Sequence, residues 1–480
     1  MRSRLLSVSI FFAFVPASAF LSLLLWYLYT SSNIFYDNFY RKDIADVEPV
    51  LTTSFSPQTA SRSAWNSYGR NTIVRPRPPS ECIDPFRLPG YLYLPSESDS
   101  VADTRWVPFY PSFADAPDPT EAVYPRPTEA GDLLLKDTGI ERDFFSLSPT
   151  QWTKKLIFYY NILSELDSRD GHNPKIINAD EKSILEEMEW IRHRRVLSVG
   201  DSVDRFMVLD FCEEFRGATF VEEGGRQGEQ RTTASCHIPF VNLTIMQWHL
   251  PSTLTYRPSW WWIPDMSIVA FEQRLEEVYR KTLPRLLGWG GRPDLVLFQT
   301  GFWDERAFRE AEHAEEEKSL PEAQKTKVWW KSNSQLKWSE LRFVAARVKK
   351  VVRMLRQELG EDSPLMYRAL STKRDGKEQD LGLISVDRMM RALMAQLDVE
   401  VFEWGKIVYG FTSEYQDELH IRRGRLSWLW ADMVISYLFR GAGGVEIEGK
   451  VKVKPTNDTW FDVAKNWAEC HRWLISWEGR

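Results

Sequence analysis

A serine that follows a strand-like run is the first residue of this chain whose surroundings suggest chemistry. The apolar run 196–199 ends in Gly200 and Asp201, and a helical pattern begins at once with Ser202. A serine at a helix start, at the carboxyl end of a strand, faces the edge where open α/β sheets bind ligands, and backbone N–H groups there can stabilise an oxyanion. Gly200 allows a sharp turn at this point. Ser202 is therefore a candidate nucleophile, with a simple helix cap as the alternative.

His420 is the histidine whose spacing best suits a general base. Of the seven histidines, only His420 follows an aspartate, Asp417, by three residues in a loop between a strand-like run and a helix. A tight turn with this spacing can present the carboxylate to one ring nitrogen while the other nitrogen faces a serine. The alternative is an ordinary polar surface loop. The sequence predicts a catalytic triad of Ser202, His420 and Asp417.

A scaffold that could bring these residues together is predicted from about residue 145 onward. Short apolar runs predict strands at 196–199, 243–248, 295–299, 365–369 and 399–404. Segments with a periodicity of about 3.6 residues predict helices at 203–215, 271–287, 336–359, 384–397 and 428–439. Alternating strands and helices are typical of parallel strands joined by right-handed crossovers. We therefore expect a three-layer α/β/α domain with a mostly parallel sheet.

The amino terminus predicts a membrane anchor. Residues 5–29 contain no charged side chain, and a helix of this length crosses a hydrocarbon core of about 30 Å. Arg2 and Arg4 precede the run, which places the rest of the chain in the lumen or outside the cell. The apolar run continues past the small residues at 17–19, which favours an uncleaved anchor over a cleaved signal peptide, the alternative. Two sequons, at Asn242 and Asn457, agree with a luminal, N-glycosylated domain.

Composition divides the chain into three parts. Prolines are concentrated between Pro49 and Pro127, where regular helices and central strands are disfavoured. We expect an anchor at 1–30, a Pro-rich stem or wrapping segment at 31–140 and a catalytic domain at 141–480. The apolar clusters 91–94 and 106–110 are expected to pack on the globular body.

Charge and cysteine usage narrow the function classes. The net charge of −6 gives no global attraction to nucleic acid. The four cysteines form no CxxC pair and no zinc-binding spacing, and we expect no metal site. In an oxidising compartment they allow two bridges with three connectivities, of which Cys212–Cys236 would close a short loop. The cysteines are Cys82, Cys212, Cys236 and Cys470.

Gly-Asp-Ser near the start of an α/β domain and Asp-x-x-His near its end resemble the SGNH/GDSL hydrolase superfamily. More narrowly, the chain resembles its membrane-anchored branch of PC-esterase and trichome-birefringence-like proteins, over about residues 196–440. Residues 295–304 resemble the third block of that family, and residues 242–251 its middle strand. The resemblance implies a single-pass type II Golgi protein that acts on polysaccharide acetyl groups. It also implies that Ser202 is the nucleophile, His420 the base and Asp417 its orienting carboxylate, with acetyl-CoA or an acetylated intermediate as a possible donor and no bound cofactor.

One departure from the family keeps other functions open. SGNH enzymes place an asparagine in the third block to stabilise the oxyanion, whereas this chain has Trp303 and Asp304 there. The alternatives are a non-catalytic glycan-binding or scaffolding pseudoenzyme, and a lipid or phosphodiester esterase. A glycan substrate predicts aromatic side chains beside Ser202, and a lipid substrate predicts a long apolar slot. The remaining candidates for oxyanion or substrate contacts are Gly200, Asp201, Arg205, Gly301, Trp303 and Asp304.

Overall fold

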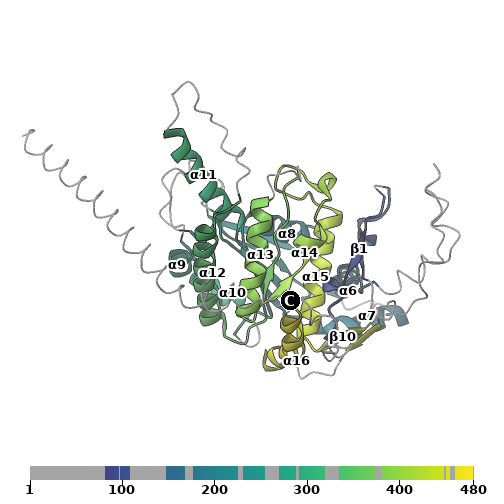
Figure 1. The fold of residues 1–480 in the computed structure, drawn as a ribbon. Helices are drawn as coiled ribbons and strands as arrows, with labels where there is room; N and C mark the ends of the chain where they lie inside the picture. The colour runs from purple at the N-terminus through teal and green to yellow at the C-terminus, as the bar shows by residue number, and fades with distance from the viewer. Residues whose placement is uncertain are drawn as a thin grey trace, which may run out of the picture. The chain divides into compact units, whose positions relative to one another are not determined.

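A seven-stranded sheet is the centre of the structure, a computed structural model (Figure 1). It describes residues 82–96, 98–108, 148–167, 177–224, 231–254, 270–287, 291–318, 335–374, 381–447, 450–453 and 460–478. The strand order is β4-β5-β6-β3-β7-β8-β9. Five strands are parallel, namely β6 (Leu243–His249), β3 (Arg195–Gly200), β7 (Leu295–Phe298), β8 (Leu365–Arg368) and β9 (Glu400–Phe402). The expected α/β fold with a mostly parallel sheet is confirmed.

An antiparallel pair that the sequence analysis did not predict extends one side of this sheet. The strands β4 (Thr219–Gly224) and β5 (Arg231–Ile238) pair with each other, and β5 pairs antiparallel with β6. The predicted bridge Cys212–Cys236 is confirmed, and it ties β5 to the preceding helix with a Cα–Cα distance of 5.5 Å.

Helices precede the sheet in the chain, connect its parallel strands and come after its last strand. α8 (Ser202–Cys212) follows β3, and α9, a π-helical turn and α10 (together residues 271–286) lie between β6 and β7. α11 (Phe302–Lys318) and α12 (Trp338–Leu359) separate β7 from β8, and α13 (Leu381–Gln396) separates β8 from β9. α14 (Trp404–Ile407) and α15 (Arg425–Gly441) come next, then the hairpin β10–β11 (Gly444–Ile447 and Lys450–Val453) and α16 (Trp460–Glu478). α6 (Trp152–Asp167) and α7 (Ala179–Met188) precede β3.

The alternation of side chains along the strands builds two cores, one on each face of the sheet. In β3, Val196 lies in one core while Leu197 and Val199 lie in the other, because successive side chains of a strand point to opposite faces. The first core contains buried residues of α6, α8 and α15, and the second contains those of residues 271–286, α12 and α13. Figure 1 shows these two groups of helices on either side of the sheet. The three-layer arrangement follows from continuous apolar strands that are buried on both faces.

Part of the expected stem packs on the domain. β1 (Gly90–Tyr93) and β2 (Arg105–Pro108) form an antiparallel pair, and Phe86 and Trp106 are buried in the first core with Leu92 against it. Residues 76–480 form one compact unit. The described segment 82–108 therefore packs on the globular body, as we expected of the apolar cluster 91–94.

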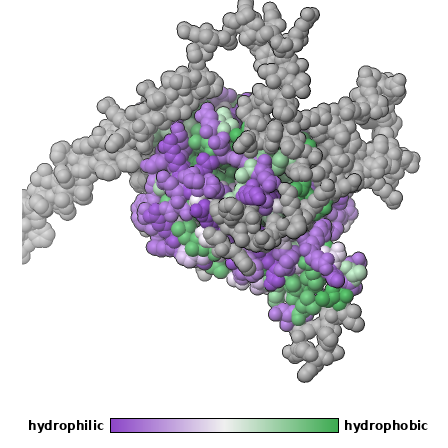
Figure 2. All heavy atoms as spheres, turned by 90° about the horizontal axis from the view of Figure 1, so that it is seen from below, coloured by the Kyte–Doolittle hydropathy of each residue, from purple (hydrophilic) through white to green (hydrophobic). Residues whose placement is uncertain are grey.

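The anchor expected at residues 1–30 lies outside the described residues. Within the described ranges, no helix is both long enough and apolar enough to cross a membrane. Figure 2 shows one face of the molecule, on which the described residues are mainly hydrophilic and the hydrophobic ones gather in smaller areas.

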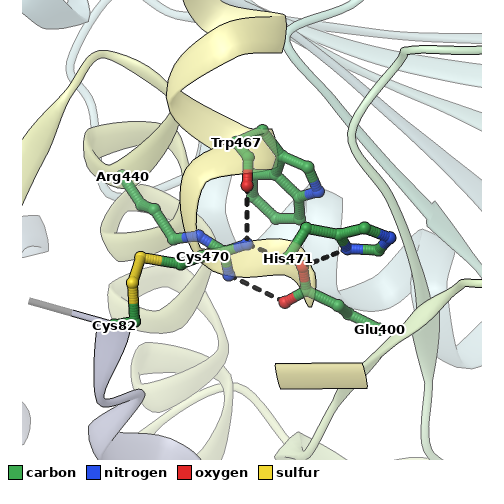
Figure 3. Close-up of a disulfide and its surroundings, with 6 residues drawn as sticks. All are labelled: Cys82, Glu400, Arg440, Trp467, Cys470 and His471. Carbon is green, nitrogen blue, oxygen red and sulfur yellow. Dashed lines mark hydrogen bonds and ion pairs between the residues drawn. A yellow bond between two sulfur atoms is a disulfide. The ribbon is translucent and has the colours of Figure 1, made fainter. Parts of the chain in front are cut away.

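A second disulfide and a buried ion cluster attach the last helix, α16, to the rest of the domain (Figure 3). Cys470 of α16 is bonded to Cys82, 388 positions away in the sequence. The Glu400 carboxylate, fully buried on β9, accepts hydrogen bonds from Arg440 at 2.6 and 2.7 Å and from Nδ1 of His471 at 2.7 Å. The disulfide thus joins the beginning of the described domain to its last helix, and the ion cluster joins that helix to β9 and α15.

We expect the Glu400 cluster to make stability dependent on acid pH. Burial by itself raises the pKa of Glu400, but the Arg440 guanidinium and His471 outweigh burial and lower this pKa to about 2. A carboxyl whose pKa is lower in the folded state stabilises the fold fully above its unfolded pKa, near 4.5, and this contribution disappears as pH falls toward 2. The loss is expected to be roughly 3 kcal/mol.

Urea unfolding between pH 7 and pH 2 measures this contribution. Glu400→Gln should be less stable at neutral pH and should lose less stability on acidification than the wild type. The exposed Glu361→Gln is the control and should follow the wild-type curve. Equal acid dependence of Glu400→Gln and the wild type would contradict the assignment.

Candidate active site

Ser202 stands where β3 passes into α8, as expected. It is the first residue of α8, and the side chain of Asp201 caps the helix by accepting a hydrogen bond of 2.9 Å from the N–H of Val203. A Cβ atom on Gly200 would lie 2.1 Å from the carboxylate of Asp204. Glycine is therefore required by the close approach of Asp204, rather than by the sharp turn that we expected.

The loop with Asp417 and His420 is held by hydrogen bonds between its own residues. An isolated bridge pairs Tyr415 with Ile421, and the N–H of Gln416 donates to the carbonyl of His420 at 2.9 Å. The Oδ1 atom of Asp417 accepts the N–H groups of Leu419 and His420, both at 2.8 Å. These local bonds orient the carboxylate toward the histidine that follows three residues later.

The three predicted triad residues meet. The Oγ atom of Ser202 is 2.7 Å from Nε2 of His420, although the two residues are 218 positions apart. Nδ1 of the same ring is 2.8 Å from Oδ2 of Asp417. Both distances lie within the hydrogen-bond range that proton transfer between such groups needs.

The surroundings of the triad favour a charged Asp417. Partial burial raises the pKa of Asp417, but the backbone N–H groups of His420 and Leu419, together with the imidazole, outweigh it and bring this pKa below its ordinary value. Phe206 packs edge-on against the ring of His420, with the centroids 4.8 Å apart. The carboxylate can therefore fix the tautomer of the imidazole while Phe206 restricts its rotation.

Asp201 is a second acid beside the nucleophile. It is buried, and its pKa is raised to about 6 by burial first and then by the nearby Asp204, against the opposing effect of Arg368. Its carbonyl oxygen and that of Gly200 accept hydrogen bonds from the amide of Gln247 at 3.3 and 2.7 Å. Asp201 thus helps to hold the turn in place.

A cavity of about 180 Å³ opens beside Ser202. Phe302, Trp303 and Leu419 give it aromatic and apolar surface, and Glu305 and Arg309 form a buried ion pair at its wall. Its described lining is completed by Asp201, Ser202, Val203, Arg306, Lys373 and Glu418. The space next to the nucleophile is small and partly aromatic, with several charged side chains in its lining.

Two other candidates from the sequence, Asp304 and Arg205, are bonded to partners on other elements. The carboxylate of Asp304 is buried and accepts hydrogen bonds from Ser252 at 2.7 Å and from the hydroxyl and N–H of Thr253 at 2.8 and 3.0 Å. Asp304 therefore ties the loop after β6 to the start of α11. Arg205 is buried and paired with Glu222 of β4 at 2.8 Å.

Gly301 is needed at the turn from β7 into α11. Its φ of 134° lies in a region that favours glycine, and a Cβ atom there would be 2.9 Å from side chains of Leu370 and Val386. This turn brings Phe302 and Trp303 to the cavity. Of the third-block candidates, Trp303 is the one whose side chain faces the nucleophile region.

Comparison with known proteins gives no match. No family model matches this chain, and no curated protein or solved structure is significantly similar to it. Function must therefore be argued from the site itself.

The sequence analysis missed most of the charged cavity lining. Arg306, Arg309 and Lys373 come from α11 and from the loop after β8, two segments without a recognisable motif. An arginine repeated three residues apart on a helix that starts at a strand end was the available signal, since such residues share a face. In the part of the chain that the structure describes, no group of His, Cys, Asp or Glu side chains is arranged to hold a metal ion.

Proposed function

We propose that this protein is a serine-dependent acyltransferase or esterase of the SGNH type that adds acetyl groups to a glycan or removes them. The observation that carries the proposal is the hydrogen-bonded series from Ser202 to His420 to Asp417, with distances of 2.7 and 2.8 Å. A nucleophile, a base and an orienting carboxylate in this order suit acyl transfer.

The reaction proceeds in two steps. His420 takes the hydroxyl proton of Ser202 while Oγ attacks the carbonyl carbon of an acetyl ester, and the protonated imidazole then gives its proton to the leaving alcohol. The product of this step is an acetyl-serine. In the second step His420 deprotonates a sugar hydroxyl or a water molecule, which attacks the acetyl-serine and restores the free serine.

The amino terminus of α8 is our candidate for oxyanion stabilisation in place of the missing asparagine. Ser202 is the first residue of α8, and N–H groups in the first turn of a helix have no acceptor within the helix. The N–H of Val203 is already used by Asp201, which leaves the N–H of Ser202 as the proposed donor. The partial positive charge of the helix terminus supports the same role.

The cavity favours a sugar over a long acyl chain. Its volume of about 180 Å³ is below the range of roughly 300–1,000 Å³ of drug-sized pockets, so it holds about one sugar ring. Phe302 and Trp303 offer aromatic faces, while the ion pair Glu305–Arg309 and Lys373 supply polar groups for hydroxyls. A long apolar slot, as a lipid esterase requires, is not what these residues form.

Trp303→Ala is expected to raise KM for an acetylated glycan about tenfold with a smaller change in kcat, because stacking on the ring contributes to substrate binding. Steady-state kinetics with the glycan measures this. Trp338→Ala, which removes an exposed tryptophan at the start of α12, is the matched control and should leave both constants unchanged. A Trp303→Ala enzyme with wild-type KM would remove this residue from the proposed sugar site.

The test of the proposed function is intact mass spectrometry after incubation with p-nitrophenyl acetate. We expect a single acetyl adduct, mapped to Ser202 and absent from Ser202→Ala. A wild-type protein that is folded, binds glycan, forms no adduct and releases no p-nitrophenol would instead establish the non-catalytic alternative.

We propose further that the domain is luminal, in a single-pass type II Golgi membrane protein. Two disulfides, Cys82–Cys470 and Cys212–Cys236, support an oxidising compartment. The proposed partners are the membrane, through residues 1–30, and a polysaccharide or glycoconjugate substrate. Acetyl-CoA or an acetylated intermediate would supply the acetyl group.

Glycosylation should fall on Asn457 rather than Asn242. Nδ2 of Asn242, the atom to which a glycan is attached, is 2.8 Å from Nδ1 of His193, and Oδ1 accepts from Arg195 at 3.2 Å. The hydroxyl of Thr244, which completes this sequon, is 3.1 Å from His237. In a eukaryotic host, Asn457→Gln is expected to abolish the mobility shift on N-glycosidase treatment, and Asn242→Gln to leave it unchanged. The reverse pattern would contradict this assignment.

A further inference from the structure

A buried ion pair lies beneath the candidate nucleophile. Arg368, the last residue of β8, is fully buried and donates from Nε to Oδ1 of Asp204 at 2.7 Å and from Nη2 to Oδ2 at 2.8 Å. Asp204 is also fully buried and lies in the first turn of α8. In the sheet β7 lies between β8 and β3. The guanidinium of Arg368 therefore extends past the end of β7 to reach α8, the helix that follows β3.

The same carboxylate touches the turn that carries the nucleophile. Its Oδ1 atom is 3.3 Å from the hydroxyl of Ser198, and its Oδ2 atom occupies the space where Gly200 would otherwise have a Cβ atom. Arg368 is fixed in turn by a hydrogen bond from Nη1 to the carbonyl of Ala369 at 3.2 Å. A two-pronged bond fixes both distance and orientation, which one ammonium group cannot do.

Stability alone does not account for such a pair. The desolvation of two charges usually costs about as much as their attraction returns, and apolar residues of similar volume are often equally stable. The location is the informative feature, since Asp204 is two residues from Ser202 and in contact with Gly200. A shift of about 1 Å in a catalytic group can cost about a hundredfold in rate.

We propose that Arg368 is a positioning residue for the nucleophile: its bond to Asp204 holds the first turn of α8 so that Oγ of Ser202 stays within hydrogen-bond distance of Nε2 of His420. This inference rests on the proposed function. The inference goes beyond the proposed function because it assigns a role to Arg368, which lies outside the triad and outside the cavity and is 164 positions from Asp204.

Labelling of Ser202 by a fluorophosphonate tests the role without an identified substrate. Arg368→Lys keeps the charge and loses the two-pronged geometry. We expect its maximal labelling rate to fall ten- to a hundredfold, with the concentration for half-maximal rate unchanged within about threefold. A lower maximal rate with an unchanged half-maximal concentration indicates a displaced Ser202 oxygen, whereas a damaged cavity would raise the half-maximal concentration. Circular dichroism and thermal melting report whether the variant is folded.

The pair Arg391–Glu403 supplies the matched control. Arg391, on α13, also makes a two-pronged bond, through Nη1 and Nη2 to the carboxylate of Glu403 just after β9, both at 2.8 Å. Arg391→Lys should label at the wild-type rate within about twofold, although it loses a comparable ion pair.

The outcomes for the inference and for the proposed function are distinct. A folded wild type that is never labelled at Ser202 would overturn the proposed function. A wild type that is labelled, with folded Arg368→Lys labelled equally fast, would overturn only the positioning role. If Arg368→Lys does not fold, Asp204→Asn takes its place, because the amide keeps one acceptor for the guanidinium and weakens the same link.

Discussion

Ser202→Ala and His420→Ala are each expected to lower kcat/KM for an activated acetyl ester by at least about 10⁴-fold. The reason is geometric. The Oγ of Ser202 is 2.7 Å from the Nε2 of His420, so removing either atom ends proton transfer from the attacking oxygen. The double variant should be little slower than either single variant, because members of a triad act as a unit.

Asp417→Asn should leave more residual activity than the other two variants. Its Oδ2 atom is 2.8 Å from Nδ1 of His420, while Oδ1 is held by two backbone N–H groups. An amide in this place can keep the loop closed while it loses the charge that stabilises the imidazolium. Residual activity between that of the wild type and that of His420→Ala is the expected result.

Initial rates with p-nitrophenyl acetate measure all four variants. Ser385→Ala, on the exposed side of α13, and His237→Gln, on β5, are matched controls and should retain near wild-type rates. Additive losses in the double variant, or a His420→Ala protein that still forms the acetyl adduct at the wild-type rate, would show that His420 is not the base.

Removing the disulfide Cys82–Cys470 should destabilise the domain more than removing Cys212–Cys236. The first bridge closes a loop of 388 positions and the second a loop of 24. In the chain-entropy description the stabilisation grows with the logarithm of loop length, which gives about 6 kcal/mol for the long loop and about 3.5 kcal/mol for the short one. The difference arises in the unfolded chain, which the long bridge restricts more.

Paired substitutions avoid leaving a free thiol. Cys82→Ser with Cys470→Ser should lower the free energy of unfolding by about 2.5 kcal/mol more than Cys212→Ser with Cys236→Ser, measured by denaturant unfolding at pH 7. Labelling of Ser202 should survive both changes at low denaturant, because neither bridge touches the triad. Equal losses, or a larger loss for the short loop, would show that local contacts of α8 and β5 outweigh loop entropy.

The sequence by itself determined the central strands and the triad. Strands β3, β6, β7 and β8 are predicted because each is buried on both faces and therefore reads as a short, continuous apolar run. Asp417 and His420 are predicted as a pair because their contact is local, formed within one turn of three residues. Ser202 is recognisable because the change from strand to helix is visible in the residues around it.

Other features depend on packing that leaves little trace in the sequence. The strand pair β4–β5 was missed because β4 is an edge strand with mostly exposed side chains. α11 was missed because residues 310–318 are mostly charged and show no apolar periodicity. Asp304 and Arg205 looked like substrate contacts, and their structural role follows from partners on other elements, Ser252 and Glu222.

Only the tertiary structure decided which distant residues support the nucleophile and close the domain. Arg368 meets Asp204, and Cys82 meets Cys470, across 164 and 388 positions. Some strands that are adjacent in the sheet are not consecutive in the chain, since β3 lies between β6 and β7. A short sequence pattern indicates which residues are buried and where the chain turns, because both depend on residues that are close in the sequence. It cannot report which strand ends share an edge, because that depends on the order in which the whole sheet is assembled.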